Sequence, residues 1–226
     1  MNFEDAIRLT EILLALALIQ QSLEHLAGPA RDRPLFAARM LLCVAVVAGV
    51  ASPWPLAGLA ALSLATLHRF QGPYNGGSDR MGLLALWCLT GARLAPGPNW
   101  QELAFGYLGL QLMLSYFISG WVKVVNPDWR SGRALRDVFQ FSAYPVSEDL
   151  RRWADRPRVL RAMSWAVMGF ELAFPLTLLS APSLAVGLVV AATFHLANAC
   201  LFGLNRFFWT WLAAYPAILW LQHRFF

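Results

Sequence analysis

Apolar residues along this chain gather in blocks, and they do not alternate with polar residues as they would in half-buried β-strands. The first block is the weakest, since its uninterrupted apolar core covers only residues 12–19. Several blocks are shorter than the ~20 residues that cross a bilayer comfortably. The pattern predicts an all-α, polytopic membrane bundle of about eight transmembrane helices, forming a single domain over residues 1–226. The predicted spans are 6–26, 36–52, 54–70, 81–96, 101–123, 158–179, 183–204 and 206–222.

Composition agrees with a membrane protein, because 58% of the residues are hydrophobic and only 14% are charged, against roughly 25% charged in soluble domains. In the eight-span arrangement, the loops on one side and their flanks hold fifteen of the 18 lysine and arginine residues. Cytoplasmic loops carry such an excess. We therefore expect a bacterial cytoplasmic membrane protein with the 124–157 loop in the cytoplasm. The net charge of +5 is explained by this bias and does not predict nucleic-acid binding.

The long loop has a pattern of its own. Leu135, Val138 and Phe139 can share one helical face, while the neighbouring arginines point elsewhere. This predicts an interfacial amphipathic helix near 131–142, with arginines available to lipid phosphates. Ser147, followed by two acidic residues, predicts the capped start of a second short helix. A solvated charged loop is the alternative.

Polar residues within the predicted spans fall on single helical faces. In the fifth span, polar residues recur at every fourth position: Gln111, Ser115, Ser119 and Lys123. Lys123 is the only lysine in the chain, and Tyr116 and Gly120 lie beside these residues. Glu171 lies near the middle of the sixth span, and His195 and Asn198 share a face of the seventh. Such residues avoid lipid and face neighbouring helices or a wet cavity.

Each of these residues also has a structural explanation. Lys123 can be an interfacial anchor at a helix end, His195 a hydrogen-bonded core residue, and Asn198 a contact between helices. Glu171 is the exception, because an unpaired carboxylate inside a membrane costs a few kcal/mol, so it must be protonated or paired. Lys123 and His195 are its candidate partners. Together these residues predict a polar intramembrane site.

Metal chemistry is not predicted. The four histidines form no closely spaced pair, and the three cysteines lie in separate apolar blocks without a C-x-x-C motif. No dinucleotide-binding or phosphate-binding glycine motif is present.

Two stretches carry a family resemblance: YFISGWVKVVNPDWRSGRAL at 116–135 and FHLANACLFGLNRFFWTWLAAYP at 194–216. With YNGGSDRMGLL at 74–84, they resemble the horizontally transferred transmembrane domain (HTTM) family, whose best-known member is the vitamin K-dependent gamma-carboxylase. The resemblance covers nearly the whole chain. Where the carboxylase has a histidine in its early loop, this chain has Gly77, and no counterpart of the carboxylase's propeptide-binding domain is seen.

The resemblance implies catalytic roles for Lys123 and His195, and Glu171, predicted from its place within an apolar span, is the third candidate catalytic residue. Lys123 lies at, or one place from, the lysine proposed to receive the peroxidic reactivity of oxidised vitamin K hydroquinone. The resemblance implies a reduced quinone, such as vitamin K hydroquinone, as cofactor. Candidate cofactor-binding residues are Asn75, Asp79, Tyr116, Ser119, Trp129 and Asn198.

Two functions remain open at this point. The first is a membrane enzyme, carboxylase-like or oxidoreductase-like, that uses a lipid-soluble quinol to modify a small molecule or peptide. The second is a non-catalytic membrane partner for the maturation, export or immunity of a secreted peptide, since one bacterial group with the Asn75 and Asp79 form of the early loop resembles such proteins. A lone desolvated lysine favours the first, because an amine can lose its proton where arginine cannot.

Overall fold

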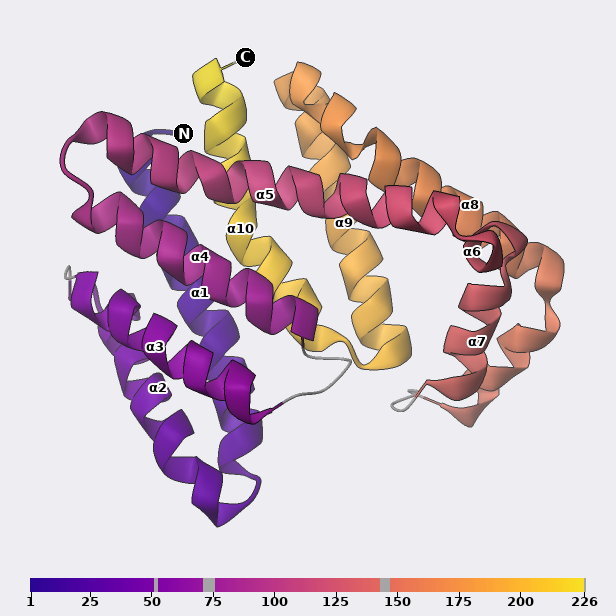
Figure 1. Cartoon of the computed structure of the whole chain (residues 1–226), viewed down its shortest axis with the longest axis horizontal. Coiled ribbons are helices and arrows are strands. Elements are labelled where there is room, and N and C mark those ends of the chain that lie inside the picture. The colour runs from indigo at the N-terminus through magenta and orange to yellow at the C-terminus, as the bar shows by residue number, and fades with distance from the viewer. Residues whose placement is uncertain (51–52, 71–75, 143–146, 226) are drawn as a thin grey trace. The chain divides into compact units, whose positions relative to one another are not determined.

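The computed structural model describes residues 1–50, 53–70, 76–142 and 147–225, and within these ranges it contains helices and no β-strand. The predicted all-α class is therefore confirmed. The elements, with η marking a 3-10 helix, are α1 (Phe3–Leu26), η1 (Ala30–Asp32), α2 (Arg33–Val47), α3 (Pro53–Arg69), α4 (Gly76–Leu94), α5 (Pro98–Val125), α6 (Pro127–Ser131), α7 (Arg133–Phe141), η2 (Glu148–Asp155), α8 (Pro157–Ala173), η3 (Phe174–Leu179), α9 (Ala181–Phe202) and α10 (Asn205–Phe225) (Figure 1).

Four stretches in the described part of the chain are long and apolar enough to cross a membrane: α1, α5, α8 with η3, and α9, of 24, 28, 23 and 22 residues. The first predicted span, the weakest by sequence, is among them. Helices α2 and α3 have only 15 and 17 residues, fewer than the ~20 that a straight span needs. The chain is thus helical where spans were predicted, but a count of eight spans is not confirmed.

Contacts between residues divide the chain into two units, which are described separately. The first unit consists of residues 1–110 and 206–225. In it α1 packs against α2 and α4, and α3 packs against the same two helices. The second unit consists essentially of residues 111–205 and contains the last part of α5 and the elements α6 to α9.

The loop between α5 and α8 in the second unit is structured. Helix α7 corresponds to the amphipathic helix predicted near 131–142, and Ser147 caps η2 by accepting a hydrogen bond from the Asp149 N–H at 3.1 Å. The apolar side of α7 is partly covered by the protein itself, because Leu135 and Phe139 are buried whereas Val138 is exposed. They pack with Ala154, Leu160 and Phe202.

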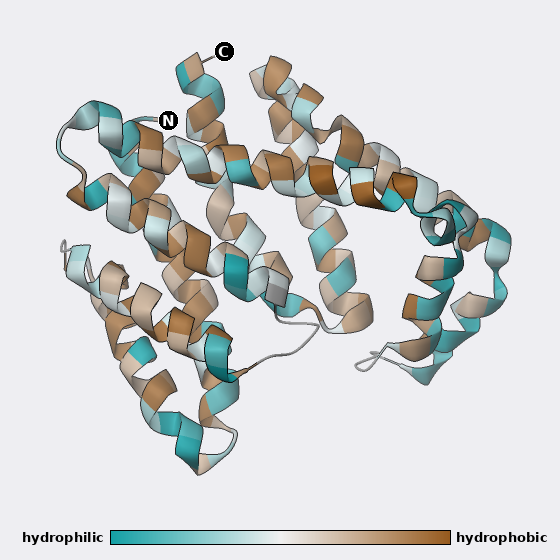
Figure 2. Ribbon diagram, in the orientation of Figure 1, coloured by the Kyte–Doolittle hydropathy of each residue, from teal (hydrophilic) through white to brown (hydrophobic). Residues whose placement is uncertain are grey.

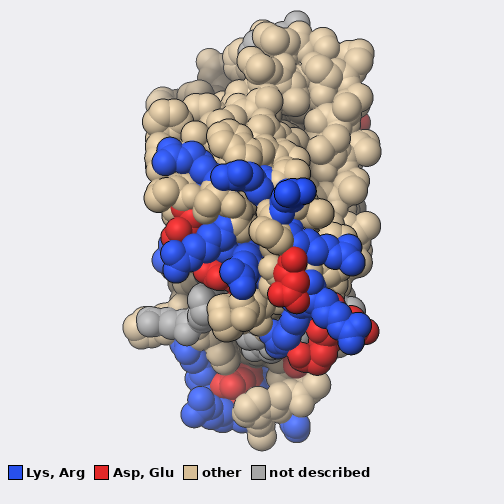
Figure 3. Space-filling view, turned by 90° about the vertical axis from the view of Figure 1, so that its right-hand side faces the viewer, with Lys and Arg blue, Asp and Glu red and all other residues tan. Residues whose placement is uncertain are grey.

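Hydropathy varies along the second unit as expected for a membrane protein. Figure 2 shows hydrophobic residues through the middle of α5 and along α8, and hydrophilic residues in the segment from α6 to η2. On the face in Figure 3, basic residues mixed with acidic ones occupy the middle and lower parts, and the upper part is mostly uncharged. The exposed arginines of this segment and of the start of α8 are Arg130, Arg133, Arg136, Arg152, Arg156, Arg158 and Arg161.

Candidate functional site

Lys123 and Glu171 form an ion pair in the second unit. The Lys123 Nζ lies 2.6 Å from each carboxylate oxygen of Glu171 and donates a hydrogen bond to both. The Glu171 side chain is 4% exposed and that of Lys123 is 18% exposed. Glu171 is therefore paired, as expected for a carboxylate within a membrane span. Its partner is Lys123, one of the two candidates.

Close approach of α5 and α8 makes this pair possible. A Cβ atom added to Gly120 would lie 2.9 Å from the Cβ of Glu171 and 2.9 Å from the backbone N of Leu172. Only glycine fits at such a separation. Tyr116, Gly120 and Lys123 therefore form the packed face of α5, one turn apart from each other, as expected for residues spaced by three and four along a helix.

Trp129 closes the other side of the lysine. Its ring centroid lies 5.3 Å from the Lys123 Nζ, a distance at which the ring face attracts an ammonium. Asn126 caps α6 by accepting a hydrogen bond from the Asp128 N–H at 2.9 Å, and Pro127 starts the helix. This short helix brings Trp129 back over the end of α5, where it also packs on the Leu135 and Phe139 cluster.

A second polar pair lies deeper in the same unit. The Tyr116 hydroxyl and the His195 Nε2 are 2.9 Å apart and hydrogen-bonded, and the two residues are 3% and 5% exposed. Helix α9, which carries His195, packs closely against η3. A Cβ added to Gly187 would lie 2.6 Å from the Thr177 side chain. The rings of Phe170, Phe174 and Phe194 surround the pair.

The remaining candidates lie apart from these two pairs. Ser119 is exposed and Asn198 is half-buried. A four-residue step advances about 40° beyond a full helical turn, so the stripe from Gln111 to Lys123 winds around α5 and does not stay on one face. Asp79 lies in the first unit, where its Oδ1 accepts a hydrogen bond from Gln21 Nε2 at 2.9 Å. Asn75 lies outside the described residues.

Two polar networks in the first unit were not predicted. In one, Glu11 is 6% exposed and its oxygens lie 2.8 Å from Arg93 Nε and 3.2 Å from Arg8 Nη1. In the other, Arg39 Nη2 donates to Gln21 Oε1 at 2.9 Å. The available signal was a charged or amide residue inside an apolar block, the same signal that identified Glu171. Among the described residues, no three histidine, cysteine or acidic side chains are grouped as a metal site would require.

Long apolar helices, together with ion pairs and hydrogen-bonded polar residues enclosed between them, define this chain as an integral membrane protein. The model of the HTTM domain matches residues 87–222, which is more than half of the chain and includes both polar pairs of the second unit. The chain therefore belongs to the HTTM family, as the sequence motifs predicted. No curated protein and no solved structure matches it significantly.

Proposed function

We propose that this HTTM protein is a membrane enzyme in which the Lys123 amine acts as a base toward a substrate that is modified with a lipid-soluble quinol as the reductant. The observation that supports this most is the symmetric 2.6 Å contact between Lys123 Nζ and both Glu171 oxygens. Lys123 is the only lysine of the chain, and all 17 other fixed cations are arginines.

The pair allows the amine to be uncharged without loss of charge balance. Transfer of one proton from Nζ to a Glu171 oxygen gives a neutral amine and a neutral carboxylic acid, and the net charge of the pair stays zero. We take this neutral form of the pair as the reactive one. A neutral lysine can then accept a proton from a substrate, which an arginine at this position could not do because its guanidinium remains protonated.

Trp129 and Glu171 position this amine from two sides. The ring of Trp129 lies over Nζ at 5.3 Å and the carboxylate holds it at 2.6 Å, so the side chain loses little further freedom when a substrate arrives. Lys123 is 18% exposed whereas Glu171 is 4% exposed. The proton-accepting atom is therefore the member of the pair that a substrate reaches first.

Tyr116 and His195 form a second group able to hold or move a proton. A hydroxyl can donate and accept hydrogen bonds, whereas an imidazole nitrogen does one or the other according to the tautomer. The Tyr116 hydroxyl and the His195 Nε2 lie 2.9 Å apart. Tyr116 and Lys123 lie two turns apart on helix α5, and His195 lies on α9. We assign Tyr116 and His195 the role of orienting a polar ring substituent and of taking up or releasing its proton.

These residues fit a quinol in their chemistry. Lys123, Tyr116 and His195 offer donors suited to quinol or quinone oxygens, and the phenylalanine rings about His195 suit an aromatic ring. When bound, a quinol supplies two electrons and two protons. We assign its contacts to Tyr116, His195 and Trp129, with Asn198 and Ser119 at the margin of the same unit.

The membrane arrangement proposed with this function has eight spans in a single domain in the bacterial cytoplasmic membrane. The 124–157 loop faces the cytoplasm, and α7 lies at the interface. The excess of exposed arginines between Arg130 and Arg161 supports that orientation. These arginines are available to lipid phosphates even though the apolar side of α7 is partly packed on the protein.

Mass spectrometry of metabolites and secreted peptides tests the proposal. Cells with wild-type protein, cells without it, and cells with Glu171→Gln or Gly169→Ala are compared at equal membrane abundance. Gly169 is the matched control, because a Cβ there meets nothing within 4 Å. We expect a mass change that requires the wild-type chain, persists in the control and disappears in Glu171→Gln. Extracts identical with and without the protein would favour the non-catalytic partner of a secreted peptide.

A further inference from the structure

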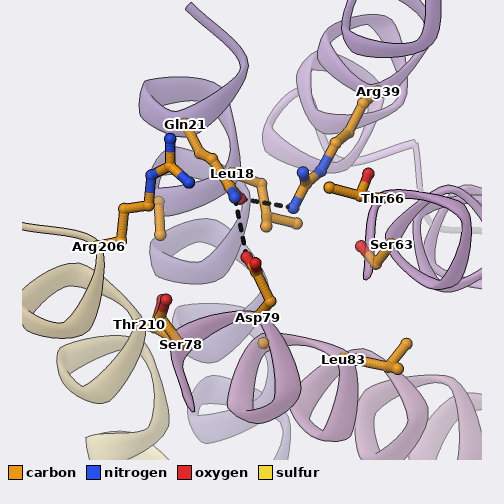
Figure 4. A pocket seen from close by; sticks show the side chains of 12 residues that line it. Leu18, Gln21, Arg39, Ser63, Thr66, Ser78, Asp79, Leu83, Arg206 and Thr210 are labelled. Atoms are coloured by element: carbon orange, nitrogen blue, oxygen red, sulfur yellow. Dashed lines mark hydrogen bonds between the residues drawn. The ribbon is translucent and has the colours of Figure 1, made fainter. Parts of the chain in front are cut away.

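A polar pocket lies within the first unit, and its lining includes none of the residues proposed above for catalysis (Figure 4). Helices α1, α2, α3, α4 and α10 all contribute to its walls. The residues that matter for its chemistry are Gln21, Arg39, Ser63, Thr66, Asp79 and Arg206. In Figure 4 the side chains of Arg39 and Asp79 both reach the amide group of Gln21.

Arg39 is the central group of this pocket. It is 2% exposed, and its Nη2 donates to the neutral amide of Gln21 at 2.9 Å. Its Nε and Nη1 have no hydrogen-bond partner among the described residues, and the same holds for the Ser63 hydroxyl on the pocket wall. Three of the seven unsatisfied buried side-chain atoms found in the described part of the chain thus belong to one pocket.

These unsatisfied atoms specify an acceptor. A guanidinium only donates hydrogen bonds, and a serine hydroxyl can donate as well. Arg39 forms no ion pair with any carboxylate in the described ranges. Asp79 is occupied on one oxygen by the Gln21 amide. The Asp79 carboxylate attracts Arg39 electrostatically without forming a direct ion pair. A buried guanidinium that lacks a directly bonded carboxylate is costly, so an anionic acceptor is favoured over a neutral one.

The charges at the pocket agree with an anion. Its lining includes two arginines, Arg39 and Arg206, and one carboxylate, Asp79. Arg206 is also paired outside the lining with Glu24 at 2.8 Å. The cavity volume is about 10 Å³, close to what one water molecule occupies on this measure. This volume is sufficient for one oxygen atom of an anion.

We propose that this pocket binds the oxyanion group of a carboxylate or phosphate, with one oxygen accepting hydrogen bonds from Arg39 and Ser63. The anion is either free in solution or part of a lipid headgroup. Arginine suits this ligand because its donors match the geometry of carboxylate and phosphate oxygens. The site does not depend on the proposed activity of Lys123, and it is tested without any enzymatic assay.

Thermal unfolding of the full-length protein in nanodiscs provides the test. One arm adds sodium phosphate or sodium acetate to neutral phosphatidylcholine discs, against sodium chloride at equal ionic strength. The other arm replaces part of the phosphatidylcholine by phosphatidylglycerol. We expect Tm to rise in at least one arm for wild type and for Arg31→Gln, a control that removes an exposed arginine with a side chain 78% exposed. Arg39→Gln should abolish the rise.

The arms distinguish the two sources, because a free oxyanion acts in the first and a lipid headgroup in the second. No rise in either arm, or a rise that survives Arg39→Gln, would overturn the proposal. If Arg39→Gln does not fold, Ser63→Ala is the deciding variant, because it removes one hydrogen bond to the anion. The concentration of anion or anionic lipid that gives half of the maximal rise in Tm should then increase about 10-fold. An unchanged half-maximal concentration in Ser63→Ala would then refute the site.

Discussion

Replacing Glu171 by alanine should destabilise the protein through the lysine that it leaves behind. In the folded protein, Lys123 Nζ lies 2.6 Å from the carboxylate, whose side chain is 4% exposed. Glu171→Ala removes the counter-charge and leaves the ammonium 18% exposed beside Gly120 and Trp129. No other carboxylate in the described part of the chain forms an ion pair with Lys123.

The magnitude follows from distance and burial. Two unit charges 2.6 Å apart attract each other by about 6 kcal/mol at an effective dielectric constant of ~20, and the desolvation of both groups offsets part of this. Removing one partner of a buried pair costs roughly 3–5 kcal/mol in soluble proteins. Because Lys123 ends α5 and can move toward water, we expect about 3 kcal/mol. At 2–4 °C per kcal/mol for a chain of this size, Tm falls by roughly 6–12 °C.

A melting series in detergent, followed by tryptophan fluorescence, measures this change. Cys43→Ala is the control, since this buried residue forms no ion pair, and it should cost about 1 kcal/mol. The double variant Lys123→Met with Glu171→Met should recover most of the loss, because apolar replacement of a whole buried pair is often close to neutral. Equal melting points for Glu171→Ala and Cys43→Ala would show that the pair does not stabilise the fold.

Three further predictions follow from local geometry. Gly120→Ala should lower the stability by about 1–3 kcal/mol, because the added methyl group overpacks against α8. Gly169→Ala, where a Cβ meets nothing within 4 Å, should be neutral or stabilising. Melting curves of the two variants measured in parallel test both predictions. Ser180→Ala removes the capping box of α9 and should cost about 1 kcal/mol in the same assay; no change would mean that this end contributes nothing to stability. Arg152→Cys, at a side chain 82% exposed, should resist an impermeant maleimide in intact cells, and labelling from outside would reverse the proposed orientation.

The sequence predicted the helices well because each apolar block is longer than a strand and is bounded by proline, glycine or charge. The SAPS stretch is an example: Ser180 caps α9 through Ser183, with Pro182 in its first turn. The number of spans could not be obtained in this way. Whether a helix of 15 to 19 residues crosses a bilayer depends on its neighbours and on the local membrane thickness, which the residue pattern does not contain.

The sequence predicted which residues belong to the site better than it predicted which of them contact each other. Glu171 had to have a partner because of its cost in an apolar environment, and Lys123 was one of two candidates. The selection between them depends on the approach of α5 to α8 at Gly120, a tertiary contact that spacing along one helix cannot reveal. His195 was likewise placed on the packed face of α9, but its hydrogen bond to Tyr116 required the structure.

The burial of Arg39 was not predicted from the sequence. The fifteen lysine and arginine residues that predicted the membrane orientation include Arg39, which is 2% exposed and bonded to Gln21. An arginine contributes the same to a loop count whether its head group reaches water or a neighbouring helix. Burial of that head group is decided by α1 and α4, which supply Gln21 and Asp79.

The most direct test of the account compares Lys123→Arg with Lys123→Ala at matched membrane abundance, scored by the mass change that requires the wild-type protein. Arginine preserves the charge toward Glu171 and Trp129 but cannot lose its proton near neutral pH. If Lys123 is a base, both variants lose the signal while retaining insertion and folding. Retention of the signal in Lys123→Arg, with loss only in Lys123→Ala, would mean that a fixed positive charge is sufficient, and it would contradict the proposed role of the lysine.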